Sequence, residues 1–411
     1  MLEMLSSDTQ ATLLLVGDFT RSNGAKPLTT VEYNKLAKQL HELNLRPADL
    51  VREIPKQLVA DRDRLKGLLS RGTSLALAME RWSQLGIKVV GRGDDAYPKS
   101  LRKKLRGAAS PIIYYAGNPE LMDAEAICVV GSRNVSDAGL KFATELGKRC
   151  ATEGLCVVSG DARGTDRAAM EGSLDNKGCV VAVLVDSLAK AVLAKRNRAA
   201  ILAGELLLMT PYNPEGGFTV YKAMDRNKYM YALSSAAVIV DSDIKGGTWS
   251  GAVENEKRRW TSAFVRIDAE VPLGNQRLAE MGLRPIPPLQ EDEKLSLRDF
   301  LFSNRGEDTA QRNLLSEASP TEARAKATGS QSLYDHFLRD LAAWLADGPQ
   351  KEATIAERFD LERSQVKRWL DRALEDDALE RLKRPVRYGL RSSDGDAVQA
   401  NSSNAQSDLL L

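Results

Sequence analysis

The sequence predicts an α/β protein built on a Rossmann-like, doubly wound and mostly parallel sheet. Two apolar runs, residues 127–130 and 155–158, each end in a glycine-containing turn. Between them, residues 138–151 place apolar side chains at helical spacing. The same strand–turn–helix order recurs at least five times before residue 268. This alternation is typical of a parallel sheet whose strands are joined by crossover helices.

Further elements are expected along the chain, although the sequence leaves the strand order undetermined. Additional strands are predicted at residues 87–90, 111–115, 178–185, 205–212, 236–240 and 264–267, the last being the final strand. A helix that begins at Asp225 should precede the strand at 236–240. Near the N-terminus, Thr29 and Glu32 have the spacing of a capping box at the start of a helix.

Composition changes divide the chain into five segments. They are an N-terminal helical region (1–86), the Rossmann-like core (87–303), a linker rich in Ser, Thr, Ala, Asp and Glu (304–332), a winged-helix-like domain (333–390) and a disordered tail (391–411). In the fourth segment, residues 354–358 and 364–374 have helix-turn-helix spacing, and residues 382–390 could form the wing. Basic and acidic residues alternate there, so both a DNA and a protein partner stay open for this domain.

The two glycine-containing turns carry the chemistry of an anion site. Gly131 and Gly160 allow sharp turns and a close approach of a ligand to the backbone. The helix N-termini that follow favour phosphate, and Arg133 and Arg163 add guanidinium groups suited to phosphate oxygens. The alternative is that these glycines only form tight turns. Neither a GxGxxG nor a GxxxxGK[ST] motif occurs, so a dinucleotide site and a P-loop lose their main support.

Composition excludes several other classes of protein. The chain has 411 residues, a net charge of +2, four cysteines and two histidines. Such a charge predicts a local basic patch rather than a basic protein. The cysteines fall in apolar segments and lack CxxC spacing, which argues against zinc, and neither His41 nor His336 lies in a motif, which argues against a Ser-His or Cys-His pair. With no long apolar run and no signal peptide, we expect a cytoplasmic protein. With no histidine in the motifs and no metal-ligand cluster, we expect that it is not an enzyme and needs no cofactor.

Several motifs, in order, resemble the DNA-processing protein A (DprA/Smf) family. They are VVGSR, VVSGDARGTDRAAMEGSL and DRNKYMYALSSAAVIVDSD, flanked by DDAYPKSLRKKL, PIIYYAGNPELM and KGGTWSGA. The resemblance covers roughly residues 28–267, and the N-terminal region is similar to sterile-alpha-motif or helix-hairpin-helix modules. It implies a single-stranded DNA binder that acts in DNA uptake and recombination, assists a RecA-type recombinase and forms a homodimer.

Matching the family motifs residue by residue implies a set of DNA-facing positions. They are Gly131, Ser132, Arg133, Ser159, Gly160, Arg163, Gly164, Asp166, Arg226, Asn227, Lys228, Gly247 and Thr248. Among them, Asp166 is expected to cap a helix or orient an arginine, because its charge repels phosphate. Phe218, Tyr221 and Tyr229 are candidates for base stacking or for the core.

Departures from the family pattern suggest a divergent branch and keep two alternatives open. Lys228 replaces the final arginine of the family's Arg-Asn-Arg segment, and Met170 replaces the histidine of its Ala-Ala-His segment. One alternative is a regulator or antitoxin in phage defence, with a toxin as its partner. The other is a nucleotide-processing enzyme of the lonely-guy phosphoribohydrolase type, in which Gly246-Gly247 and Glu254 would form the site.

Overall fold

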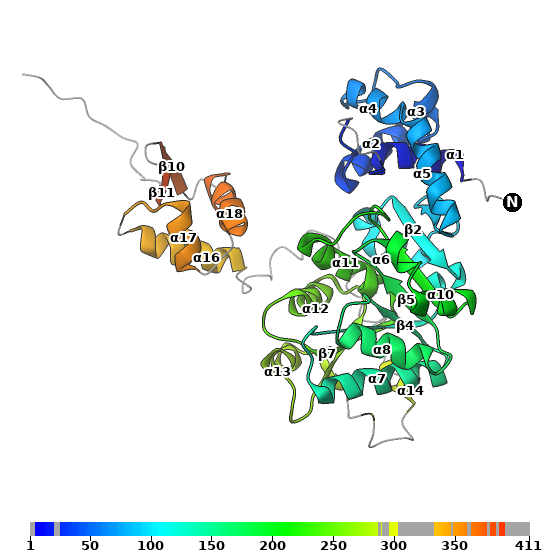
Figure 1. Ribbon diagram of the computed structural model, residues 1–411. Coiled ribbons are helices and arrows are strands. Elements are labelled where there is room, and N and C mark those ends of the chain that lie inside the picture. The colour runs from blue at the N-terminus through cyan, green and yellow to red at the C-terminus, as the bar shows by residue number, and fades with distance from the viewer. Residues whose placement is uncertain are drawn as a thin grey trace, which may run out of the picture. The chain divides into compact units, whose positions relative to one another are not determined.

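The computed structural model describes residues 5–19, 25–286, 289, 296–302, 333–346, 348–359, 363–375, 379–383 and 386–390. The chain forms two compact units, Met1–Gly306 and Glu307–Leu411 (Figure 1). The predicted linker and tail, residues 304–332 and 391–411, lie outside the described residues.

A single large sheet organises the first unit. In its described part nine strands follow the order β1-β2-β6-β5-β4-β3-β7-β8-β9. The strands are β1 (Lys88–Gly91), β2 (Ile112–Gly117), β3 (Ala126–Gly131), β4 (Cys156–Ser159), β5 (Val180–Val183), β6 (Leu206–Thr210), β7 (Ala236–Asp241), β8 (Ser262–Arg266) and β9 (Arg284–Ile286). The strands from β6 to β9 run parallel, whereas β2 is antiparallel to both β1 and β6. The predicted Rossmann-like, mostly parallel α/β sheet is therefore confirmed.

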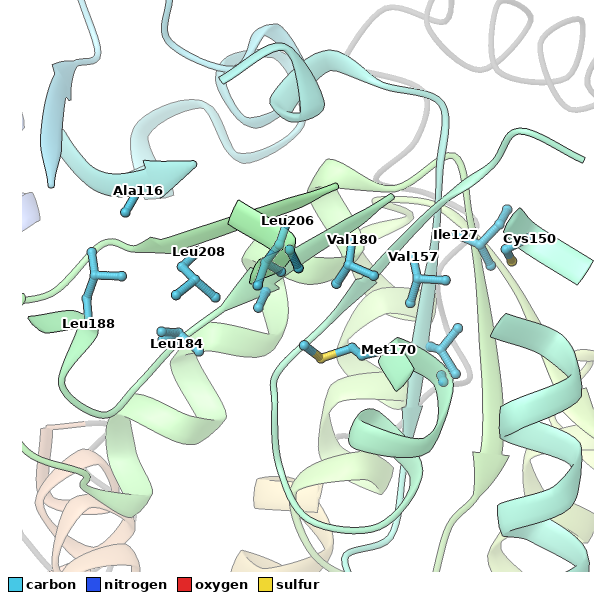
Figure 2. Packing of buried hydrophobic residues seen from close by; sticks show 14 of the residues in the cluster. Ala116, Ile127, Cys150, Val157, Met170, Val180, Leu184, Leu188, Leu206 and Leu208 are labelled. Carbon is cyan, nitrogen blue, oxygen red and sulfur yellow. The ribbon is translucent and has the colours of Figure 1, made fainter. Parts of the chain in front are cut away.

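Helices flank this sheet on both faces. They are α6 (Lys99–Leu105), α7 (Asp137–Thr152), α8 (Thr165–Leu174), α9 (Leu188–Ala191), α10 (Lys195–Leu202), α11 (Val220–Leu233), α12 (Gly247–Arg258), α13 (Leu273–Glu280) and α14 (Leu297–Phe302). Side chains alternate along the strands, so that Ile127 and Val129 join one apolar cluster and Cys128 and Val130 join the other. Figure 2 shows the first cluster, in which Val157 and Val180 on the sheet lie near Met170 of α8.

Small residues bring α7 and α8 into close contact on one face. A Cβ atom added to Gly147 would lie 2.1 Å from the Ala169 carbonyl oxygen, and one added to Gly172 would lie 2.3 Å from the Thr144 carbonyl oxygen. Only glycine fits at both positions, because backbone rather than a movable side chain lies opposite. This packing fixes where α8 begins, and hence the position of the turn that precedes it.

Two predicted boundaries are wrong. Residues 264–267 are not the final strand, because β9 pairs in parallel with β8. Its Arg-Pro-Ile sequence has no apolar run, and proline is tolerated there because β9 is an edge strand. The second error concerns α11, which begins at Val220 and not at Asp225. Thr219 caps it by accepting a hydrogen bond from the Lys222 amide at 3.2 Å.

The N-terminal helices pack on the sheet within the same compact unit. They are α1 (Ser7–Val16), α2 (Thr30–Glu42), α3 (Asp49–Arg52), α4 (Arg62–Leu69) and α5 (Gly72–Gln84), and α2 begins with the predicted Thr29–Glu32 capping box. Trp82 of α5 packs edge-on against Tyr114 of β2, with ring centroids 5.1 Å apart. These helices also share a core of their own around Leu36, Leu40 and Leu65. The boundary that the sequence places near residue 86 stays a prediction.

Within its described residues, the second unit contains three helices followed by a two-stranded hairpin. They are α16 (Leu333–Leu345), α17 (Glu352–Arg358), α18 (Arg363–Glu375), β10 (Leu379–Lys383) and β11 (Val386–Leu390). Leu341, Ile355, Val366 and Leu370 are buried together in its core. This element order agrees with a winged helix, and that assignment stays a prediction.

Candidate nucleic-acid interface

The β3–α7 turn lies where the chain changes direction in the sheet. From β3 the chain proceeds to β4 on one side, and it later returns to place β7 on the other side. Ser132 ties the two strands together, because its amide donates to the Asp241 carbonyl at 2.8 Å. A Cβ atom on Gly131 would lie 2.3 Å from the Thr165 hydroxyl oxygen, so the turn packs directly against α8. In open α/β sheets such a switch point is the usual place for a ligand.

The β4–α8 turn depends on two glycines for different reasons. A Cβ atom on Gly160 would lie 1.2 Å from Nη1 of Arg226, so this glycine makes room for the arginine side chain. Gly164 has a φ of +88°, and a Cβ atom there would also lie 2.6 Å from the Ser132 carbonyl oxygen. Ser159 is fully buried, and its hydroxyl donates to the Val129 carbonyl at 2.7 Å. This turn is therefore built around its neighbours, and the Ser159 hydroxyl does not face a ligand.

Arg226 lies at the centre of the site although its side chain is buried. Only 6% of the residue is exposed, and Nη1 donates to the Val183 carbonyl at 3.0 Å. Burial lowers the pKa of Arg226, and the charge of Asp166 opposes that shift. Burial raises the pKa of Asp166, whose carboxylate accepts a hydrogen bond from the Gly160 amide at 3.2 Å. Asp166 thus compensates the buried guanidinium and does not face a phosphate.

Asn227 and Lys228, which follow Arg226 on α11, have different roles. Asn227 donates to the Gly247 carbonyl at 2.9 Å and so holds the N-terminus of α12 against α11. Lys228 instead pairs with Asp225, with Nζ 2.5 Å from Oδ1, and lies 5.2 Å from the centre of the Tyr229 ring. At the start of α12, Gly246 has a φ of +97° and Gly247 is exposed.

Two adjoining cavities lie along this carboxyl edge of the sheet. The first, which we call the switch cavity, has a volume of about 500 Å³ and is lined by Gly131, Ser132, Asp166, Asn227, Gly247 and Thr248, among others. The second, the side cavity, has a volume of about 540 Å³ and lies over the ends of β4 and β5, where Gly160, Arg163 and Lys190 line it. Arg133, Ala162, Phe218 and Arg226 line both cavities, which therefore form one cleft.

The structure thus brings together ten of the thirteen predicted site residues. Ser159, Gly164 and Lys228 line neither cavity. Of the three aromatic candidates, Phe218 is 44% exposed beside the cleft, whereas Tyr229 is buried in the core and Tyr221 is exposed away from both cavities. The Arg133 guanidinium lies 5.2 Å from the centre of the Phe218 ring.

Several side chains of the cleft were not among the predicted site residues, and Lys190 and Tyr231 are two examples. Lys190 follows the third parallel strand, so its position at the same edge could have been found from the topology. Tyr231 lines the switch cavity, but its position within an apolar stretch of α11 indicates only a core residue.

Across the described ranges, His, Cys, Asp and Glu side chains form no group of three that could hold a metal ion. No helix in these ranges is both long and apolar enough to cross a bilayer.

Comparison with known proteins places this cleft in a family. Residues 88–284 match the sequence profile described as DNA recombination-mediator protein A. These residues belong to the DprA/Smf family. The chain is 29% identical over 212 residues to a putative DNA processing protein DprA of Mycobacterium tuberculosis, a match that covers 48% of this chain and 51% of the relative. It is 27% identical over 157 residues to the DNA processing protein DprA of Streptococcus pneumoniae, covering 38% of this chain and 54% of the relative.

The chain thus spans about half the length of the curated DprA relatives that it matches. Among solved structures, the X-ray structure of DprA from Streptococcus pneumoniae aligns with a TM-score of 0.55 and 19% identity. That alignment covers 70% of this chain and 96% of the other. At this identity the likeness shows the DprA fold.

Proposed function

We propose that this protein binds single-stranded DNA in the cleft at the carboxyl edge of its sheet and acts in DNA processing as a recombination mediator. The observation that carries the proposal is the continuity of the two cavities through Arg133, Phe218 and Arg226. Each cavity has the volume of a site for one small ligand. Side by side, they suit neighbouring units of an extended strand.

The charge balance of the cleft supports a phosphate backbone as the ligand. Six Arg or Lys side chains and four Asp side chains line the two cavities. Two of these aspartates are compensated, because Asp166 lies beside Arg226 and Asp161 pairs with Arg196, with Nη2 2.5 Å from Oδ1. The cleft is therefore locally positive although the whole chain carries only +2.

The exposed ring of Phe218 favours a single strand over a duplex. An aromatic face stacks on a base only when that base is free of its partner strand. The guanidinium of Arg133 lies against the same ring and can contact a phosphate while the ring holds the base. This pairing of a cation with an aromatic ring is typical of single-strand sites.

The finer parts of the role rest on the family resemblance. We infer that the bound strand is passed to a RecA-type recombinase and that the chain forms a homodimer in the cytoplasm. A phage-defence regulator with a toxin partner would use the same cleft for a nucleic acid. The phosphoribohydrolase alternative has less support, because Glu254 is exposed on α12 and is not among the residues that line either cavity. Release of free base from nucleoside monophosphates would revive it.

A salt titration with three ligands tests the proposal. Fluorescence anisotropy is measured with a labelled single strand, the matching duplex and a labelled nucleotide. The salt concentration is varied about fourfold, from roughly 50 to roughly 200 mM. We expect the single strand to bind best, with a log–log slope of roughly 0.7 per phosphate contact. Equal or tighter duplex binding without a salt response would contradict the cleft assignment. Lys148→Ala removes an exposed cation from the C-terminal half of α7, at a position that lines neither cavity, and serves as the control.

A further inference from the structure

Two cysteines lie side by side at the amino edge of the sheet, at the opposite end of the strands from the cleft. Cys156 is the first residue of β4, and Cys179 directly precedes β5. These strands run parallel with Val157 paired to Val180, so the two cysteines are the preceding pair in the same register. The Val157 amide donates to the Cys179 carbonyl at 2.9 Å, which joins the two backbones at this point.

Both side chains project from the same face of the sheet. Cys156 belongs to the apolar cluster that contains Val158 and Val181, and Cys179 packs against that cluster. Paired residues on neighbouring strands are about 5 Å apart, within the roughly 4.4–6.8 Å between Cα atoms that a disulfide spans. Both cysteines are free, and the Cys156 thiol donates a hydrogen bond to the Cys179 sulfur. The backbone therefore already has the spacing that a disulfide needs.

The two thiols differ in access and in acidity. Cys156 is fully buried, and its hydrogen bond with Cys179 and its burial both raise its pKa. Cys179 is half-buried, and the hydrogen bond from Cys156 lowers its pKa to about 7. A thiolate is the nucleophilic form of a cysteine, so Cys179 is the reactive member of the pair at neutral pH. An accessible nucleophile with a second thiol in reach is the arrangement of an oxidisable cysteine and its resolving partner.

The two other cysteines of the chain lack both properties. Cys128 and Cys150 are fully buried, and burial raises the pKa of each thiol. Cys150 also belongs to the apolar cluster on the other face of the sheet (Figure 2). Oxidation should therefore begin at Cys179.

We propose that Cys179 and Cys156 form a peroxide-reactive site that is oxidised to a reversible disulfide. The Cys179 thiolate attacks one oxygen of hydrogen peroxide and the O–O bond breaks, which gives the Cys179 sulfenic acid and a hydroxide that is protonated to water. The Cys156 sulfur then attacks the sulfenic sulfur, an S–S bond forms, and the S–O bond breaks as the leaving hydroxide takes the Cys156 proton. The two thiols lose two electrons, and one peroxide gains them and becomes two waters.

The test is oxidation of the reduced full chain by a small excess of hydrogen peroxide, followed by peptide mapping without reduction. The wild type should give two peptides joined through Cys156 and Cys179 and should lose two free thiols, which dithiothreitol restores. In Cys156→Ala the reaction should stop at the Cys179 sulfenic acid, which dimedone traps as an adduct of known mass. A bridge to Cys150 instead, or four intact thiols in the treated wild type, would overturn the proposal.

Alkylation by iodoacetamide at pH 7 measures the reactivity of Cys179 separately from the bridge. Without the hydrogen bond from Cys156, the thiolate fraction should fall about 15-fold, towards that of an ordinary thiol with a pKa of about 8.5. Each thiolate would become about fivefold more nucleophilic, so alkylation should slow by about threefold in Cys156→Ala. An equal rate in this variant and the wild type would show that Cys156 does not activate Cys179 and would contradict the proposal.

Cys150→Ala is the matched control, because it removes a buried thiol from the other face of the sheet. It should keep the wild-type alkylation rate and still form the bridge. Mapping of the wild type needs no variant, so the proposal stays testable even if Cys156→Ala does not fold. Because the pair lies away from the cleft, its failure to form a bridge leaves the proposed function untouched, and loss of single-strand binding leaves this site untouched.

Discussion

The cleft has a buried floor and an exposed rim, and an arginine lies in each. The two regions differ in what their side chains contact. On the floor, Asp166, Arg226 and Asn227 are each at least 91% buried and engage groups of the protein. On the rim, Arg133 and Phe218 are exposed and contact each other. An arginine in a family motif can therefore serve folding at one position and binding at another, and its burial distinguishes the two.

The difference makes a general prediction. Substitutions on the floor should lower the free energy of unfolding, and binding should suffer as a consequence. Substitutions on the rim should lower affinity while the melting temperature stays constant.

Gly160→Ala should be the most damaging single change. The added methyl group would lie 1.2 Å from Nη1 of Arg226, so the guanidinium has to leave its contact with Val183 while Asp166 stays buried. We expect the free energy of unfolding to fall by about 3 kcal/mol, because overpacking and the displacement of a buried charge from beside Asp166 would both destabilise the fold. Urea denaturation followed by circular dichroism measures it.

Gly217→Ala provides the control for that change. Gly217 is exposed, lies next to Phe218, and a Cβ atom there meets nothing within 4 Å. Its stability should remain equal to that of the wild type or rise by about 0.5 kcal/mol through a less flexible unfolded chain. Equal losses in both alanine variants would show that Arg226 is not the reason why Gly160 is needed.

Phe218→Ala probes the rim and should leave the fold intact. Loss of one stacking platform should weaken single-strand binding by about 2 kcal/mol. The matched variant is Tyr221→Ala, since Tyr221 is 77% exposed but lines neither cavity. Anisotropy titrations of both should separate them by roughly thirtyfold in Kd. If both lose affinity equally, the whole exposed end of α11 binds the strand.

The smallest effect to be measured is the change in the pH dependence of stability that Asp166→Asn should produce. The folded protein raises the pKa of Asp166 by burial, so ionisation is harder in the native state than in the unfolded chain. The stabilisation that results from this shift is complete below the pKa of Asp166 in the unfolded chain. It is lost as the pH rises through the raised pKa of the native state. Relative to Asp166→Asn, the wild type should therefore lose stability as the pH rises above the ordinary carboxyl pKa of about 4. Thermal melts across this range would contradict the account if the two curves stay parallel.

The sequence was sufficient for the type of the sheet but not for its strand order, and ten of the thirteen predicted site residues line the cleft. The strands β3 and β4 are apolar runs that end in glycine-containing turns. Parallel strands bring their carboxyl ends to one edge, so the sequence predicts that Gly131 and Gly160 meet there. Lys228 could not be placed in this way. Its side chain turns to Asp225, a local ion pair that competes with the cleft.

Other features depend on tertiary contacts that no local pattern records. The Arg-Pro-Ile segment of β9 becomes a strand only because β8 offers it a partner. In the sequence Tyr231 cannot be distinguished from a buried aromatic residue of the core, because only the folded structure shows that it lines the switch cavity. Thr219 has the side chain of a helix cap, and this signal predicts the start of α11 at Val220 and places Phe218 just before the helix N-terminus.

We propose that the rim of the cleft, and not the C-terminal unit, binds the single strand. The direct test compares the double variant Arg133→Ala, Arg163→Ala with a chain that ends at Asn304, using one labelled oligonucleotide at two salt concentrations. Each lost contact should weaken binding by about 1.5–3 kcal/mol, less where solvent screens it, and reduce the salt slope by about 0.7. We expect the double variant to lose more affinity than the truncated chain, with an unchanged melting temperature. Loss of binding on truncation, with binding retained in the double variant, would contradict the account and assign the DNA site to the C-terminal unit.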